Sequence, residues 1–140
     1  MGIRRRARIL AFQALFSWDF GRSDITELVR FPWISEEKAK DYSEEVLSFA
    51  RLLVQGCIEN INTVDNEIKE HLEHWDINRL VKVDLALLRL GCYSLLYQPN
   101  IPATVTIDEA IDIAKMFGSD DSYRFINGVL DGIRKSIETE

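Results

Sequence analysis

The segment from Leu80 to Tyr97 constrains the fold more than any other part of the chain. Its apolar residues leave little room for a polar face: Leu80, Val81, Val83, Leu85, Leu87, Leu88, Leu90, Leu95 and Leu96. The charged residues in it are Lys82, Asp84 and Arg89. A helix that is apolar on nearly all sides is buried among other elements. We therefore expect a central helix here, onto which the other helices pack.

Apolar residues recur at helical spacing along the rest of the chain. We expect helices over about residues 5–20, 24–29, 35–58, 63–72, 106–117 and 121–137. Ser35 is the expected start of the long helix over residues 35–58. Thr106 to Glu109 fit a capping box at the start of the helix over residues 106–117. Seven glycines and three prolines are few for this length, which favours long helices over a sheet with many turns. The sequence predicts about seven helices in one all-α domain, residues 1–140.

Two local features predict packing. Phe31 and Trp33 flank a proline between predicted helices, where we expect both rings to plug the side of the core. Gly128 and Gly132 lie inside the last predicted helix, where each costs about 1 kcal/mol relative to Ala. Such glycines predict the close approach of another backbone.

Four arginines stand at the start of the first predicted helix: Arg4, Arg5, Arg6 and Arg8. The chain as a whole has a net charge of -6, so this tip is opposite in sign to the rest. Guanidinium groups match phosphate oxygens and stack on flat rings. Positive charge at a helix N-terminus opposes the helix dipole, which favours a functional role over a stabilising one. We expect a phosphate-rich partner, most simply a nucleic acid, with a solvated tail as the alternative.

A second candidate surface lies at the start of the last predicted helix, where Asp121, Tyr123, Arg124 and Phe125 follow one another closely. Proteins bind single-stranded RNA by stacking unpaired bases on aromatic rings and by hydrogen bonding to base edges. An aspartate can accept a hydrogen bond from an exocyclic amine of a base. It can equally cap the helix, and both alternatives stay open.

Other chemistry is poorly supported. His71 and His74 are too few for a metal site, which needs three or four ligands. The carboxylates of Asp108, Glu109 and Asp112 favour the dipole of the helix on which they lie. Cys57 and Cys92 lie in apolar patterns, as buried thiols of a reducing cytosol do. We expect no catalytic residue, no metal and no cofactor.

Targeting signals are equally weak. No apolar run approaches the roughly 20 residues that span a bilayer. A mitochondrial presequence is disfavoured, because the arginines run directly into an apolar helix.

Several blocks of the sequence resemble the NusB family of bacterial transcription antitermination factors, and the resemblance covers essentially the whole chain. The blocks are Ala14-Leu15-Phe16-Ser17-Trp18, Thr106-Ile107-Asp108-Glu109-Ala110-Ile111, Ala114-Lys115-Met116-Phe117-Gly118 and Ser122-Tyr123-Arg124-Phe125-Ile126-Asn127-Gly128-Val129-Leu130-Asp131. The resemblance implies two packed three-helix subdomains with an extra helix. It also implies binding to the boxA RNA of ribosomal RNA operon leaders, together with the small-subunit ribosomal protein NusE. The assembled complex then helps RNA polymerase read through terminators.

The resemblance also implies roles for particular residues. The expected RNA-binding residues are Arg4, Arg5, Arg6, Arg8, Phe16, Asp121, Tyr123, Arg124 and Phe125. Phe16 stands where many members have Tyr, so its ring can stack but has no hydroxyl to donate. Asp84 and Arg89 fall in the region expected to meet the ribosomal protein. Some members pair with themselves, and a homodimer stays open.

Three alternatives remain. Certain ribosomal RNA cytosine methyltransferases carry a NusB-like N-terminal domain, but this chain ends at Glu140 with no cofactor-binding α/β domain. We therefore expect a free-standing cytoplasmic factor. A protein scaffold with an incidental arginine tip is the second alternative, and an enzyme is the least supported.

Overall fold

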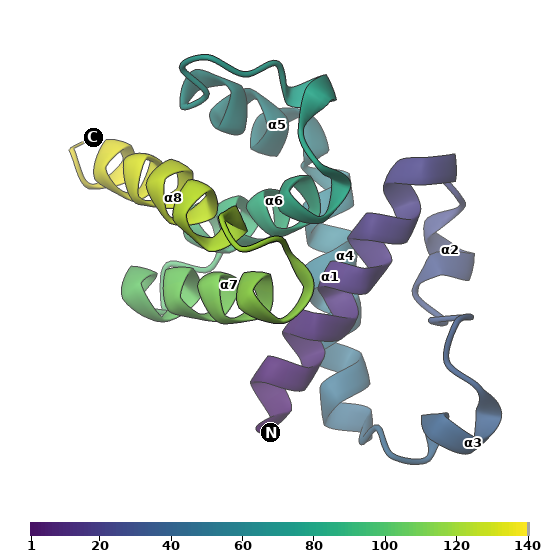
Figure 1. The fold of residues 1–140 in the computed structure, drawn as a ribbon. Coiled ribbons are helices and arrows are strands. Elements are labelled where there is room, and N and C mark those ends of the chain that lie inside the picture. The colour runs from purple at the N-terminus through teal and green to yellow at the C-terminus, as the bar shows by residue number, and fades with distance from the viewer. Residues whose placement is uncertain (140) are drawn as a thin grey trace.

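The computed structural model describes residues 1–139, and within that range it contains helices and no strand. The helices are α1 (Ile3–Gly21), α2 (Ile25–Leu28), α3 (Glu36–Ala39), α4 (Glu44–Glu59), α5 (Ile61–Glu70), the 3-10 helix η1 (Ile77–Arg79), α6 (Lys82–Tyr97), α7 (Ala103–Phe117) and α8 (Ser122–Glu138) (Figure 1). The predicted all-α class is confirmed. None of the described helices is both long and apolar enough to cross a membrane.

Helix α6 lies at the centre of the fold, as its composition predicts. Every residue from Asp84 to Leu95 is buried. Helices α1, α4, α5, α7 and α8 all contact α6 (Figure 1). Because five helices cover one, nearly every position of α6 must be apolar or must have a polar partner inside the protein.

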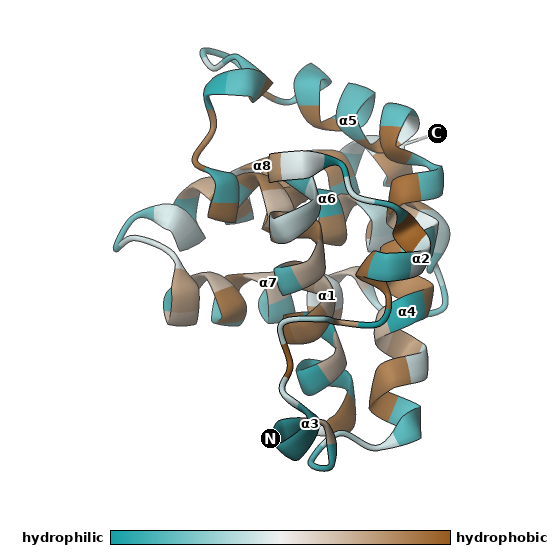
Figure 2. Cartoon of the chain, turned by 90° about the vertical axis from the view of Figure 1, so that its right-hand side faces the viewer, coloured by the Kyte–Doolittle hydropathy of each residue, from teal (hydrophilic) through white to brown (hydrophobic). Residues whose placement is uncertain are grey.

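The surrounding helices pair with each other on two sides of α6. Helix α1 packs against α4, and α7 packs against α8. The short helix α3 and the outer side of α5 are largely hydrophilic (Figure 2). Because α6 packs against both pairs, its contacts with α1 and with α7 help to fix the position of these two helices relative to each other.

Two predicted helices differ in their bounds. Ser35 does cap a helix, but that helix is the short α3, and the predicted long helix is interrupted after it. Helix α4 then begins after Ser43, whose hydroxyl accepts a hydrogen bond from the backbone N–H of Val46. The periodicity of the segment could not show this second serine cap. The expected capping box at Thr106 is also wrong, because α7 begins directly after Pro102 and Thr106 is buried inside the helix.

Close packing involves different residues from those predicted. A Cβ on Gly128 would meet nothing within 4 Å, and one on Gly132 would meet the ring of His71 rather than a backbone. Tight approaches occur instead at Gly56, where a Cβ would overlap the Tyr93 hydroxyl, and at Gly91 of α6, where a Cβ would lie 2.7 Å from Cδ1 of Leu130. Of the two aromatic residues expected in the core, Phe31 is buried, whereas Trp33 is 40% exposed.

Candidate nucleic-acid interface

The arginine tip is part of α1 rather than a tail. Because α1 begins at Ile3, the four arginines occupy its first two turns. Gly2 precedes the helix and no side chain caps the first-turn amides. Free amides and guanidinium groups therefore stand together at this end, an arrangement that favours anions.

Aromatic rings support three of the four arginines. The guanidinium carbon of Arg4 lies 4.9 Å from the centre of the Phe49 ring, and that of Arg8 lies 5.8 Å from the same centre. Arg6 lies 4.7 Å from the centre of the Tyr42 ring and donates a hydrogen bond to the backbone carbonyl of Asp41. Among residues 1–139, no carboxylate forms an ion pair with Arg4, Arg6 or Arg8. Stacking over a ring orients a guanidinium and preserves its positive charge for an external anion.

Arg8 differs from Arg4 and Arg6 in its burial. Only 7% of its surface is exposed. Burial lowers the pKa of the guanidinium, Arg4 and Arg5 lower it further, and Glu109 partly compensates. An arginine titrates so high that it stays protonated at neutral pH. Arg8 therefore adds positive potential beneath the more exposed Arg4.

The side chain of Arg5 points to α7, where it forms ion pairs with Glu109 and Asp112. Its Nε donates to Oε2 of Glu109 at 2.8 Å, and its Nη2 donates to Oδ2 of Asp112. The hydrogen bond to Glu109 is the main cause of a raised pKa for Arg5. The four arginines that look alike in sequence are thus in two different electrostatic settings.

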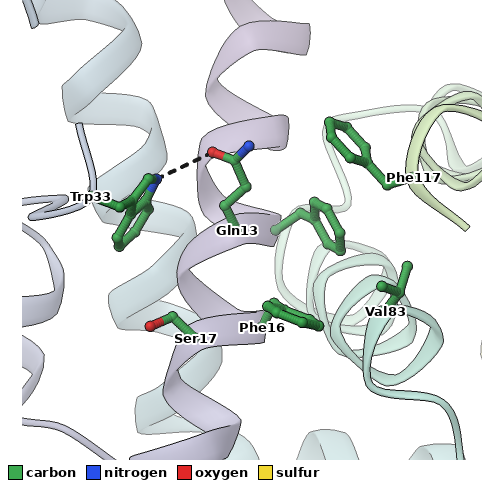
Figure 3. Close-up of a pocket in the computed structure, with 7 residues that line it drawn as sticks. Gln13, Phe16, Ser17, Trp33, Val83 and Phe117 are labelled. Atoms are coloured by element: carbon green, nitrogen blue, oxygen red, sulfur yellow. Dashed lines mark hydrogen bonds between the residues drawn. The ribbon is translucent and has the colours of Figure 1, made fainter. Parts of the chain in front are cut away.

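An aromatic groove of about 400 Å³ lies farther along α1. Its lining consists of Phe12, Gln13, Phe16, Ser17, Trp33, Val83 and Phe117. Figure 3 shows Trp33 on one side of the groove and Phe117 with Val83 on the other, with residues of α1 between them. The indole N–H of Trp33 donates to the side-chain carbonyl of Gln13 at 3.3 Å (Figure 3). The size and ring content of this groove suit a flat, partly apolar group.

The predicted residue Phe16 lies in this groove, but most of the other lining residues were not predicted from the sequence. A signal was available, because Phe12, Phe16 and Phe20 recur every four residues and so share one side of α1. Phe12 contacts Phe117 of α7 with ring centroids 5.3 Å apart. No sequence pattern links those two residues.

The start of α8 is a polar and aromatic junction. Asp121 precedes the helix without a side-chain cap bond, and its side chain is 90% exposed. Its carboxylate lies 3.8 Å from Nη1 of Arg124, a long ion pair at the surface, and the capping alternative receives no support. The hydroxyl of Tyr123 accepts from Nε of Arg124 at 3.0 Å, and the ammonium of Lys115 lies 5.0 Å from the centre of the Tyr123 ring.

A second pocket, of about 200 Å³, brings two predicted surfaces together. It is lined by Trp75, Arg79, Leu80, Val81, Asp84 and Phe125. Asp84 is 9% exposed, and its Oδ1 is buried without a hydrogen-bond partner. Phe125, expected to bind RNA, and Asp84, expected to bind a protein, thus line one pocket. Val83, which precedes Asp84 in α6, lines the aromatic groove.

Arg89 is not part of this surface. It is 3% exposed and donates to Asp65 of α5 at 2.9 and 3.0 Å and to Asp19 of α1 at 2.8 Å. Burial by itself lowers the pKa of Arg89, but the two carboxylates outweigh this and leave it raised. The donors of Arg89 are thus engaged inside the protein, and the contact with a protein partner that was expected of it stays a prediction.

The candidate metal and thiol residues offer little chemistry. Within residues 1–139 no group of three or more histidine, cysteine or acidic side chains is placed to hold a metal ion. Cys57 and Cys92 are both buried free thiols. Burial raises the pKa of Cys57 to about 12 and raises the pKa of Cys92 as well. At neutral pH both are protonated and unreactive.

Comparison with known proteins places this surface in context. The sequence model of the NusB family matches residues 5–135. The transcription antitermination protein NusB of Treponema denticola is 50% identical over 131 residues, covering 94% of this chain and 95% of that protein. The NusB of Treponema pallidum is 52% identical over 133 residues, covering 95% of this chain and 93% of that protein.

Solved structures agree with these sequence matches. A structure of T. maritima NusB has a TM-score of 0.83 at 42% identity, covering 94% of this chain and 90% of that one. A chain in the crystal structure of the antitermination factors NusB and NusE in complex with dsRNA has a TM-score of 0.84 at 30% identity. That match covers 97% of this chain and 98% of the other.

Proposed function

Because this chain belongs to the NusB family, we propose that it is a transcription antitermination factor. It binds the boxA element of ribosomal RNA operon leader transcripts together with the ribosomal protein NusE, and so promotes read-through by RNA polymerase. The observation that carries this proposal is the set of aromatic-supported arginines at the start of α1, which have no carboxylate partner among residues 1–139.

Phosphate contacts supply most of the affinity. Arg4 and Arg6 present guanidinium groups to the RNA backbone, and Arg8 adds to the positive potential below them. Three such charges on single-stranded RNA give a slope of log K against log salt concentration of about -2. Four would give about -3, which is the slope that the sequence alone predicts.

Base contacts come from the aromatic groove and the α8 junction. Phe16 and Phe117 offer rings on which unpaired bases stack, and Gln13 supplies an amide beside them. At the junction, Tyr123 and Phe125 offer further rings, and the exposed Asp121 accepts from a base amine. The rings hold any base, whereas the polar groups discriminate among bases.

The protein partner binds at the second pocket. Asp84 has a buried carboxylate oxygen without a donor, an arrangement that costs free energy unless a partner supplies one. Around it, Trp75 is 60% exposed and Val81 is 65% exposed. Exposed apolar groups around a buried acceptor suit a protein that brings a donor and apolar side chains. Because Phe125 lines the same pocket, NusE bound here lies beside the RNA.

The proposed activity is binding rather than catalysis, and its setting is the cytoplasm, where transcription occurs in bacteria. The alternative is a protein scaffold that binds NusE without RNA. The free guanidinium groups of Arg4 and Arg6 favour the RNA-binding function, because a scaffold has no need of them.

A gel-shift experiment tests the proposal. Labelled boxA RNA and a boxA with scrambled bases are titrated with the protein, with and without NusE. We expect preference for boxA, tighter binding with NusE, and loss of both in Arg4→Gln/Arg6→Gln. Lys69→Gln, which removes an exposed charge on α5, is the control and should bind as the wild type does. Recovery of NusE without RNA binding, even by the joint complex, would favour the scaffold.

A further inference from the structure

We infer that Glu109 and Asp112 withhold Arg5 from RNA, so that an internal ion-pair cluster limits the affinity of the arginine tip. This inference rests on the proposed function, because it concerns regulation of the same RNA surface. It distinguishes Arg5, whose donors are occupied by carboxylates, from the exposed Arg4, the half-buried Arg6 and the buried Arg8, none of which has a carboxylate partner within residues 1–139.

The geometry of the cluster is that of a strong arginine contact. Arg5 donates to both carboxylate oxygens of Glu109, from Nε at 2.8 Å and from Nη2 at 3.2 Å, and Nη2 also donates to Asp112. Glu109 and Asp112 are three positions apart on α7, so they face the same side of that helix. Two-point hydrogen bonding of a guanidinium to a carboxylate is among the strongest contacts that arginine makes.

The net charge of the cluster is unfavourable for RNA binding. Two carboxylates surround one guanidinium, so an approaching phosphate meets a net negative group. The side chains of Arg5, Glu109 and Asp112 are 33%, 20% and 44% exposed, respectively. The cluster is therefore partly exposed, and its negative charge can repel the phosphates of an approaching RNA.

Arg5 and Arg4 line the same hollow, so the ion pairs of Arg5 affect how an anion can bind beside Arg4. The hollow measures about 700 Å³ at the N-terminus of α1 and is lined by Met1, Gly2, Ile3, Arg4, Arg5, Glu45 and Glu109. Uncapped helix amides face this end of the helix. An arginine released from Glu109 could join Arg4 and these amides around one phosphate. The ion pair thus keeps Arg5 from joining the other anion-binding groups of this hollow.

Matched charge changes test the inference. Glu109→Gln/Asp112→Asn releases Arg5 with little change of shape. Glu59→Gln/Asp108→Asn is the control, because it also removes two carboxylates from exposed positions, one on α4 and one on α7. Neither residue lines the hollow or pairs with Arg5 within residues 1–139. Arg5→Gln is added to the releasing pair to ask whether the effect requires Arg5. Binding of labelled single-stranded boxA RNA is followed by fluorescence anisotropy at several salt concentrations, and urea unfolding checks each variant.

We expect Glu109→Gln/Asp112→Asn to bind RNA about tenfold tighter at low salt, the effect of one charge-assisted contact. Its salt slope should steepen by about 0.7, which corresponds to one more phosphate. The control should gain less affinity and keep the wild-type slope. Adding Arg5→Gln should remove the steepening.

Several results would overturn the inference. One is an equal gain in the releasing pair and the control, and another is a steepening that survives Arg5→Gln. Weaker binding by a folded releasing variant would mean that RNA needs Arg5 anchored on α7. If the wild-type protein binds no boxA RNA, the proposed function fails and this inference fails with it. Binding by the wild type without a gain in the variant contradicts the inference alone.

Discussion

Phe12 of α1 and Phe117 at the end of α7 lie with their ring centroids 5.3 Å apart. This contact joins the helix that begins with the arginine tip to the helix that leads into the α8 junction. Phe12 is almost fully buried, whereas Phe117 is 42% exposed. The first ring therefore supports the second, which remains available for a base.

Replacement of Phe117 by Ala should weaken boxA binding by about 1–3 kcal/mol, the usual contribution of one base stacked on an aromatic ring. Met116→Ala is the matched control, because Met116 precedes it on α7 and is 49% exposed. Anisotropy titrations of both variants measure the difference. Equal losses in the two variants would mean that Phe117 stacks with no base.

Replacement of Arg89 by Ala should destabilise the fold by about 3 kcal/mol, because it leaves the largely buried Asp65 without an ion-pair partner and leaves Asp19 with Lys82 as its main one. Arg89 connects Asp19 of α1 to Asp65 of α5 across the central helix. Urea unfolding followed by circular dichroism measures the loss. A change below about 1 kcal/mol would show that these acids find other partners or water.

The ion pairs of Asp19 should make stability depend on pH in the acid range. Burial by itself raises the pKa of Asp19, but hydrogen bonds from Lys82 and Arg89 outweigh this and hold it below its usual value. The resulting stabilisation is complete above the unfolded pKa of about 4 and is lost as the pH falls through the lower folded pKa. Asp19→Asn should therefore be less stable at pH 7 and lose less stability on acidification. Parallel pH profiles of the two proteins would contradict this.

Two glycine replacements should act in opposite directions. Gly91→Ala places a methyl group 2.7 Å from Cδ1 of the buried Leu130 and should cost about 1–3 kcal/mol. Gly128→Ala meets nothing within 4 Å in a helix and should stabilise by about 0.5–1 kcal/mol. Thermal unfolding of both variants checks the signs. Stabilisation by Gly91→Ala would show that Leu130 can move aside.

The sequence predicted some features well because they depend on neighbouring residues. The buried character of α6 follows from its composition, and the position of the arginines on the first turns of α1 follows from the apolar spacing that comes after them. The start of α4 could not be predicted reliably, since Ser35 and Ser43 are both competent caps and the apolar spacing spans the break between them. The exposed position of Trp33 also depended on how the loop folds against α1.

The sequence by itself determined that the chain is all-helical, that α6 is central and that four positive charges gather at the start of α1. Apolar periodicity and local charge suffice for these conclusions, because both act over a few residues. Only the tertiary structure decided that Arg5 pairs with Glu109, 104 positions away, whereas Arg4 and Arg6 stack on rings. It also placed Arg89 in the interior and Asp84 beside Phe125. Such pairings depend on which helix faces meet after packing, and spacing along the chain does not encode that choice.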